Sequence, residues 1–163
     1  MIKIINSLNE NIYLDITDLN NAAFHDISFH RCILNNLDFS ESIFYDIDFR
    51  SAEMNDSVFY NTIFVKSKLI MVESERINFE KAIFDNSMLM HSNFSNSSFK
   101  ESDLSQSILR YSNFNNCDLR GCNLSCEIIE ECTFKNAIYD EFTIWPKGFV
   151  PAEYEAINFK KLV

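Results

Sequence analysis

The sequence predicts a solenoid whose wall turns a corner every five residues. From Leu14 to Tyr139, every fifth residue except Ser74 is large and apolar, and thirteen of the 16 Phe fall in this one frame. A helix buries side chains at a period of 3.6 residues, a strand at 2 and a coiled coil at 3.5. A repeating wall that points one large side chain at a common axis in each five-residue unit explains the spacing.

A second signal lies two residues before each large side chain. This slot holds mostly Ser, Ala, Thr or Cys, because one bulky side chain per unit leaves room in a narrow interior for only a small one. The residue between the two is often Asp or Asn, whose short polar side chains bond to nearby backbone in turns. Five units carry a larger aliphatic residue in the small slot: Ile27, Leu37, Ile47, Val72 and Ile77.

This order of residues resembles the repeat of the pentapeptide-repeat family. Specimens are Ser92-Asn93-Phe94, Ser102-Asp103-Leu104, Ser112-Asn113-Phe114 and Cys117-Asp118-Leu119. The resemblance covers residues 12–141 and implies an all-β fold, the right-handed quadrilateral β-helix with four units per coil. Residues 20 apart are then expected to stack on the same wall.

The two ends of the chain depart from the frame and are expected to cap the coils. In residues 1–11, Ile2, Ile4 and Ile5 predict a strand that closes the first coil, because an open end would expose apolar interior and unpaired backbone. In residues 142–163, Trp145 and nearby aromatic residues predict a plug over the last coil. A short capping helix is expected from Pro151 onward, with Tyr154 and Ile157 facing the body.

Composition restricts the classes of function. A chain of 163 residues is enough for one domain. It has no run of 18 apolar residues and its first residues do not read as a signal peptide, so we expect no membrane contact and a cytoplasmic location. The net charge of −10 disfavours direct binding to nucleic acid. It permits a protein that presents acid to a nucleic-acid-binding partner, and solubility alone is the alternative.

Sorting outward positions by a coil of 20 residues places many acids on the wall that shares the axial positions of Leu19, Phe39 and Leu119. We call this surface the acidic wall and consider it a candidate binding surface. Its candidate residues are Asp18, Asp38, Glu41, Glu80, Glu101 and Asp118. The neighbouring wall, which includes Asn35, Asn55, Asn93 and Asn113, is rich in Asn, and stacked Asn side chains form amide ladders.

The other two walls carry apolar residues at outward positions. These predict a contiguous apolar strip, which favours an interface; ordinary packing along a β-wall is the alternative, because a stacked Ile ladder also stabilises the coils. The candidate interface residues are Ile43, Ile63, Ile83, Ile70, Met71, Met88, Met90 and Ile108.

No residue pattern predicts catalysis, a metal or a cofactor. Cys32, Cys117, Cys122 and Cys132 occupy the small inward slot and are expected to be buried small hydrophobes, whereas Cys126 is expected to be exposed and free. His25, His30 and His91 are expected on the surface without acids or cysteines placed to share a metal.

Two functions follow as hypotheses. Some pentapeptide-repeat proteins mimic DNA and bind type II topoisomerases, so the resemblance implies a non-enzymatic rod that binds or protects DNA gyrase. The alternative is a structural or regulatory module that docks a protein partner, or forms a homodimer, through the apolar walls. Ser74 is expected to leave a void or admit water at the axis, and is either a local opening or a tolerated defect.

Overall fold

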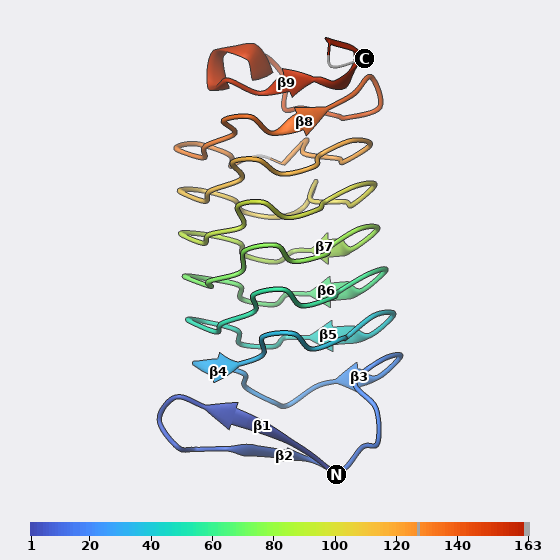
Figure 1. The fold of residues 1–163 in the computed structure, drawn as a ribbon, viewed down its shortest axis with the longest axis vertical. Coiled ribbons are helices and arrows are strands. Elements are labelled where there is room, and N and C mark those ends of the chain that lie inside the picture. Colours follow the sequence, from blue (N-terminus) through green and yellow to red (C-terminus); the bar gives the residue numbers. More distant parts are fainter. Residues whose placement is uncertain (127, 162–163) are drawn as a thin grey trace.

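The computed structural model describes residues 1–126 and 128–161, which form a column of stacked coils (Figure 1). Residues 20 apart pair in parallel, once on each side of a coil. In the middle of the column these pairs are Glu53 with Glu73, Val58 with Asn78, Ile63 with Ile83, and Lys68 with Met88. Four pairs per 20 residues make a four-sided β-helix, which confirms the predicted architecture.

Regular strands are short because a corner interrupts the extended backbone every five residues. The strands are β1 (Ile2–Asn6), β2 (Ile12–Leu14), β3 (Ala23–Phe24), β4 (Cys32–Ile33), β5 (Ile43–Tyr45), β6 (Ile63–Val65), β7 (Ile83–Asp85), β8 (Ile138–Tyr139) and β9 (Ile157–Asn158). β3, β5, β6 and β7 lie in that order in one parallel sheet on one side of the column.

Most corners are made by a residue with positive φ, two positions after the axial side chain. Asn61, Lys66 and Met71 have φ of 54°, 54° and 56° at successive corners. Asn and Asp are common at these positions, because they tolerate the left-handed region better than other residues with a Cβ. At most corners the N–H of this residue donates to a carbonyl of the next coil, as Lys66 does to Asp85 at 2.8 Å.

The axis is filled by the large side chains of the five-residue frame. All thirteen Phe in that frame are buried. Along one wall, the ring centroids of Phe24, Phe44, Phe64 and Phe84 follow each other at 4.8, 5.0 and 4.8 Å in nearly parallel stacks. The rings therefore repeat at the spacing of neighbouring strands, about 4.8 Å, and the column has a packed interior.

The small inward slot has a hydrogen-bonding role as well as a steric one. Several Ser hydroxyls in this slot donate to the axial residue's carbonyl in the preceding coil, for example Ser92 to Leu69 at 2.8 Å and Ser67 to Phe44 at 3.2 Å. These bonds satisfy buried hydroxyls and link two coils, whereas the hydroxyls of Thr62 and Ser107 donate within their own coil.

Ser74 does not open the column. It is fully buried, its hydroxyl donates to the Asn93 carbonyl at 2.9 Å, and the parallel pairing of Glu73 with Asn93 continues past it. Val72 and Ile77, two of the enlarged small-slot residues, are buried on either side of it in the chain. We infer that they fill the space that an axial Leu or Phe would occupy, since protein interiors are close-packed.

The N-terminal cap is a hairpin laid across the first coil. β1 pairs antiparallel with β2 on one side and with β4 on the other. Ile4 is buried and Ile2 packs against the core, so the predicted closing strand is present. The antiparallel pairing of β1 seals the first coil, whereas the coils that follow pair with one another in parallel.

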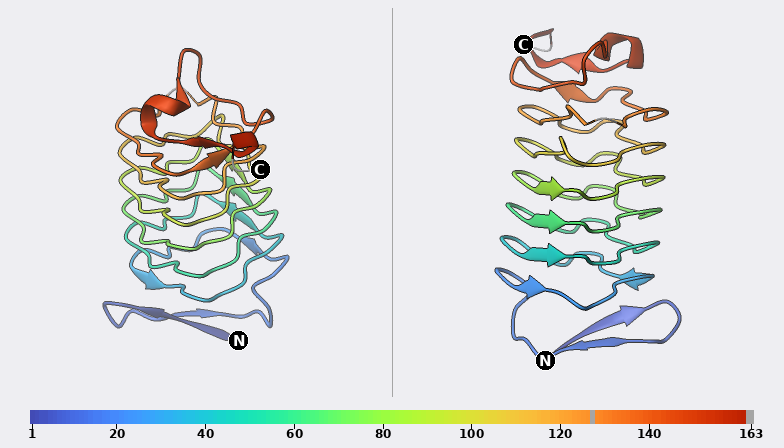
Figure 2. Two further views of the ribbon diagram at one scale, coloured as in Figure 1. Left: turned by 45° about the horizontal axis from the view of Figure 1, so that its top comes forward. Right: turned by 180° about the vertical axis from the view of Figure 1, so that it is seen from behind.

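The C-terminal segment folds over the last coil (Figure 2), and its aromatic side chains form the cap. Trp145 and Phe149 stack at 4.9 Å and both meet Phe134 edge-on, as the plug requires. Instead of one capping helix there are two 3-10 turns, η1 (Pro151–Tyr154) and η2 (Phe159–Lys161), on either side of β9. Glu155 ends η1 with φ of 59°, which lets Ile157 donate to the Ala137 carbonyl at 2.8 Å.

Candidate interaction surfaces

Outward side chains form columns because the hydrogen-bond ladder places each residue directly over the one 20 positions earlier. On the Asn-rich wall, the Asn35 side chain accepts the backbone N–H of Asn55 at 2.7 Å, and the Asn55 side chain accepts that of Glu75 at 2.9 Å. Further along, Asn113 donates to Asn93 at 3.0 Å. Of these contacts, only that between Asn113 and Asn93 joins two side-chain amides as the predicted ladder does. The side chains of Asn35 and Asn55 instead bond to the backbone of the next coil.

The acidic wall is divided into two parts by its basic neighbours. In the N-terminal part, Asp18, Asp38 and Glu41 are exposed, and no ion pair to any of them is present among the described residues. Asp18 and Asp38 accept the backbone N–H of Asn20 and Ser40 at 3.1 and 2.9 Å. Each of these two side chains is therefore held at the start of a corner, with its charge directed to solvent.

The acids in the C-terminal part of the wall have partners. Asp118 accepts two hydrogen bonds from the Arg120 Nε, at 2.8 and 3.1 Å, and this contact raises the pKa of Arg120. Glu101 lies 4.0 Å from the Lys81 Nζ, and Glu80 accepts the Ser98 hydroxyl at 2.9 Å. The six candidate residues share one wall, with three in each part. Glu101 and Asp118 have ion-pair partners, whereas the N-terminal three have none among the described residues.

The candidate apolar residues form two groups. Ile43, Ile63 and Ile83 pair in register as one column, which we call the isoleucine column; Ile43 and Ile83 are 44% and 43% exposed. On the next wall Met88 pairs with Ile108, with Ile70, Met71 and Met90 at its edge. In the chain, the corner residues Asp85 and Asn86 separate Ile83 from Met88.

Four of the five cysteines lie where the spacing predicts, and the fifth corrects the prediction. Cys32, Cys117, Cys122 and Cys132 are buried, but Cys126, expected to be exposed, is only 2% exposed. The other four are inward because of their slot, whereas Cys126, like Gln106, occupies a corner without the left-handed backbone that Asn86 adopts. Burial raises the pKa of Cys126 to about 11 and that of Cys117 to about 12.

Within residues 1–126 and 128–161, no three His, Cys, Asp or Glu side chains gather as metal ligands would. The same part of the chain has no helix long and apolar enough to cross a membrane. His25 contacts Asp26 at 2.9 Å on the surface. His91 stacks on Tyr111 at 4.8 Å, so its ring is part of an outward column.

Comparison with known proteins identifies the repeat. The family model for pentapeptide repeats matches residues 89–125 with eight copies. No curated protein matches the sequence.

Several solved structures are similar to this chain. One is QnrB1, described as a plasmid-mediated fluoroquinolone resistance protein, with 17% identity, a TM-score of 0.49 and coverage of 88% of this chain and 82% of that one. A pentapeptide-repeat protein from the Arabidopsis thaliana thylakoid lumen has 17% identity and a TM-score of 0.41, covering 70% of each chain. HetL from the cyanobacterium Nostoc, involved in regulating heterocyst differentiation, has 13% identity and a TM-score of 0.28, with coverage of 86% and 82%.

Proposed function

This chain belongs to the pentapeptide-repeat family, and from that premise we propose that it is a non-enzymatic protein-binding rod. Its acidic wall enters the DNA-binding groove of a partner, with a type II topoisomerase such as DNA gyrase as the candidate. The interior favours a role on the outside, since the axis is filled by the chain's own aromatic and aliphatic side chains.

The density of charge at the N-terminal end carries the proposal. Residues 12–51, the first two coils, hold seven acids and two bases, which is a net charge of −5, half that of the whole chain. Two coils rise about 10 Å at the spacing of neighbouring strands, so this part of the rod carries about one charge per 2 Å. B-DNA carries one charge per about 1.7 Å of its axis. The whole rod, with −10 over about seven coils, has roughly half the density of DNA.

Rigid placement adds to the resemblance in charge. The backbone N–H bonds to Asp18 and Asp38 hold their carboxylates one coil apart, and both lack ion-pair partners among the described residues. A groove that binds DNA phosphates offers Lys and Arg to such an array. Because the carboxylates of Asp18 and Asp38 are already held in place, binding them to such a groove costs little side-chain conformational entropy. This favours their competition with DNA.

A supercoiling assay with purified gyrase tests the proposal. We expect micromolar native protein to inhibit supercoiling, or to protect the enzyme from a quinolone. The triple variant Asp18→Asn, Asp38→Asn, Glu41→Gln should lose this effect by at least about tenfold, because three close ion pairs contribute well over 1.4 kcal/mol together.

The chain offers a matched control. The variant Glu80→Gln, Glu101→Gln, Asp118→Asn removes the same number of negative charges from the same wall. It removes them at the end where basic or hydroxyl neighbours already contact the acids. It should keep most of the native effect. Absence of any effect of the native chain at micromolar concentration would rule out this partner, and equal losses in the two variants would show that only net charge matters.

The exposed isoleucine column favours a second candidate function. A protein partner, or a second copy of this chain, would cover Ile43, Ile63 and Ile83 together with Met88 and Met90. Light scattering should then show a particle larger than 19.1 kDa, and Ile63→Lys or Met90→Glu should reduce it to a monomer. A native monomer that neither substitution changes would count against a homodimer.

A further inference from the structure

One face of the column carries a net positive charge, although the chain as a whole carries −10. It consists of the corner residues of one column and the outward positions of the wall before that corner, whose axial residues are Phe29, Phe49, Leu69, Leu89 and Leu109. We call it the basic face. From residue 28 to residue 111 its positions hold one acid, Asp48, and four bases, which are Arg31, Arg50, Lys68 and Arg110. None of the side chains at these positions is buried.

Two of these bases have no anionic partner on their own chain. Arg31 and Lys68 are exposed, and neither forms an ion pair within the part of the chain that the structure describes. By contrast, the Arg50 Nη2 lies 2.6 Å from Asp48, and the Arg110 Nη2 lies 3.6 Å from Glu130, an acid of the next coil. Arg31 and Lys68 are therefore available to carboxylates of another molecule.

The corner of the basic face is built without the residues that suit a corner. Its residues all have positive φ, between 55° and 63°; they are Arg31, Ser51, Met71, His91, Tyr111 and Glu131. None of them is Asn, Asp or Gly, whereas the corner of Asn36 has Asn or Asp in five of its six coils. A left-handed backbone costs more with most of these side chains than with Asn or Asp. This favours a role for them other than making the turn.

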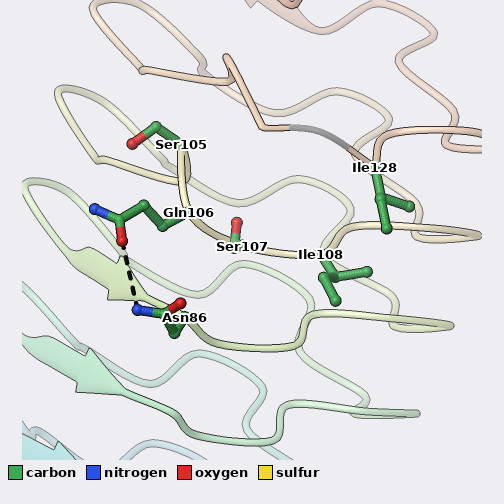
Figure 3. Close-up of a pocket in the computed structure, with 6 residues that line it drawn as sticks. All are labelled: Asn86, Ser105, Gln106, Ser107, Ile108 and Ile128. Carbon is green, nitrogen blue, oxygen red and sulfur yellow. Dashed lines mark hydrogen bonds between the residues drawn. The ribbon is translucent and has the colours of Figure 1, made fainter.

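Apolar and aromatic side chains occupy the middle of the face. Met71 and Tyr111 are 59% and 50% exposed, and the His91 ring stacks on Tyr111 at 4.8 Å. Ile108 pairs with Ile128 on the next coil, and both side chains stand on the outside of the wall (Figure 3). Met, Arg and aromatic residues are enriched in protein interfaces. The face thus has the composition of a surface that binds protein.

The basic face lies opposite the acidic wall. Each coil has four sides of five residues, so walls whose axial residues are ten apart, such as those of Leu19 and Phe29, lie on opposite sides of the column. Successive acids on one side and successive bases on the other are about one coil apart, at the strand spacing of about 4.8 Å. The two surfaces therefore match in spacing as well as in sign of charge.

We propose that the basic face binds the acidic wall of a second copy of this chain, with the two columns side by side and parallel. At equal height, Arg31 lies between the levels of Asp18 and Asp38, because the chain rises one coil in 20 residues and reaches Arg31 between them. Opposite charges then meet within one coil, about 4.8 Å. The reversed orientation would instead bring Arg31 to the part of the acidic wall that holds Lys100 and Arg120.

Apolar residues of the two surfaces also meet in the parallel arrangement. The acidic wall carries Val58 and Tyr60 at outward positions, both half-buried. Ile70 and Met71 of the basic face lie half a coil above them, about 2.4 Å. The net charge of each copy opposes association only weakly, since charges further apart than about 8 Å are screened at physiological salt.

Contacts of this kind do not close into a ring. The two surfaces lie on opposite sides of each copy, so a third copy adds in the same way as the second and a row forms. A row covers Asp18, Asp38 and Glu41 in every copy but one, and row formation therefore competes with the proposed binding to gyrase. The row itself does not rest on that function, because it needs no molecule other than this chain.

Sedimentation velocity of the full chain tests the proposal. We expect the average mass to rise above 19.1 kDa as the concentration is raised from about 10 µM to about 1 mM. One variant, Arg31→Glu with Lys68→Glu, alters the basic face, and Glu131 shows that Glu keeps the backbone of this corner. The other, Asp18→Asn, Asp38→Asn, Glu41→Gln, alters the acidic wall. Each alone should associate at least about tenfold more weakly than the native chain.

A mixture of the two variants gives the sharpest result. Each variant supplies the surface that the other lacks, so together they should form a one-to-one pair of native affinity that does not grow into rows. The control variant Lys3→Glu, Lys147→Glu makes the same change in net charge at exposed positions near the two ends of the chain. It should associate as the native chain does.

Four outcomes would overturn the proposal. They are a native chain that stays monomeric at about 1 mM, equal losses in the control and in Arg31→Glu with Lys68→Glu, a mixture that forms no pair, and assembly that survives in both variants. The last result would place the contact on another surface, such as the isoleucine column. None of these measurements involves gyrase, so they leave the proposed function to be judged by its own assay.

Discussion

The reversed unit at Val72 and Ser74 offers a sharp test of how the interior is filled. In most units the small residue comes first and the large one second, but here an aliphatic residue occupies the small slot and Ser occupies the axis. Both side chains are fully buried, and Ser74 bonds to Asn93 at 2.9 Å. If volume has been exchanged within the unit, restoring the usual order at one position alone should be harmful.

The expected energies follow from the size of the groups. Val72→Ala removes two methyl groups of roughly 0.8 kcal/mol each and leaves a cavity, so we expect a loss of about 2 kcal/mol. Ser74→Leu adds buried carbon atoms to an interior that has no room for them, and should cost about 1–3 kcal/mol. The double variant should lose less than the sum of the two by at least about 1 kcal/mol, because the added Leu fills the space that Val72 leaves.

Urea unfolding of the native protein, the two single variants and the double variant, followed by circular dichroism, measures these free energies of unfolding, provided that the m-value is the same for all four. Val72→Ala combined with Phe134→Leu, three coils away, serves as the control and should be additive to within about 0.5 kcal/mol. A Ser74→Leu variant more stable than the native protein would mean that the axis contains a void at this level. Additive losses for Val72→Ala and Ser74→Leu would mean that the two side chains do not share space.

Three further predictions concern the core, the thiols and the C-terminal cap. Phe64→Ala, between the stacked rings of Phe44 and Phe84, should lower the free energy of unfolding by about 3–5 kcal/mol in the same urea assay; a loss below about 1 kcal/mol would contradict the packed axis. Burial raises the pKa of Cys126 to about 11 and that of Cys132 to about 12, so thiol reagents at pH 8 should label all five cysteines only after unfolding, and rapid labelling of native Cys126 would refute its burial. Because the folded values lie above the ordinary value of 9.0, the stability these thiols contribute should be complete below about pH 9 and decline as the pH rises towards 11. Burial opposes ionisation of Asp140, but hydrogen bonds from the N–H groups of Gly121, Phe142 and Thr143 hold its pKa below the ordinary value; Asp140→Ala should therefore destabilise the cap by about 1–3 kcal/mol, and this difference from the native protein should shrink as the pH falls below about 4.

Much of the fold follows from the sequence because a single period controls it. The axial frame, the small slot and the stacking of residues 20 apart depend only on residue size and spacing, so the buried Phe64 and the paired Ile43 and Ile63 could be predicted. The same spacing identified the wall on which Asp18 and Asp38 lie. The burial of each side chain and the wall on which it lies can therefore be predicted from its position in the five-residue unit.

Features that depend on contacts between units were less accessible. The exchange of volume between Val72 and Ser74 is visible only when burial of both is known. The backbone at Gln106 and Cys126 lacks the left-handed conformation found at Asp46, Lys66 and Asn86, and the period alone assigned Cys126 to an outward position. The residue type does not mark this difference in the sequence, since Met71 and Tyr111 keep positive φ at another corner.

The split of the acidic wall also required coordinates. The sequence places Asp118 and Arg120 close together, but it does not show that the Arg120 side chain turns back onto Asp118. Lys160 reaches Glu141 at 2.9 Å only because the C-terminal cap folds over the last coil. The array of Asp18, Asp38 and Glu41 is distinct because no such cation reaches it among the described residues.

Displacement of DNA tests the proposed mimicry most directly. A fluorescent duplex of about 20 base pairs is bound to purified gyrase, and the chain is added while anisotropy is followed at about 0.1 M salt, where charges further apart than about 10 Å are screened. We predict that the native chain and the Glu80→Gln, Glu101→Gln, Asp118→Asn variant release the duplex at similar concentrations, whereas the Asp18→Asn, Asp38→Asn, Glu41→Gln variant needs at least about tenfold more. Release of the duplex by all three proteins at the same concentration, or by none of them, would contradict the claim that the first two coils stand in for DNA.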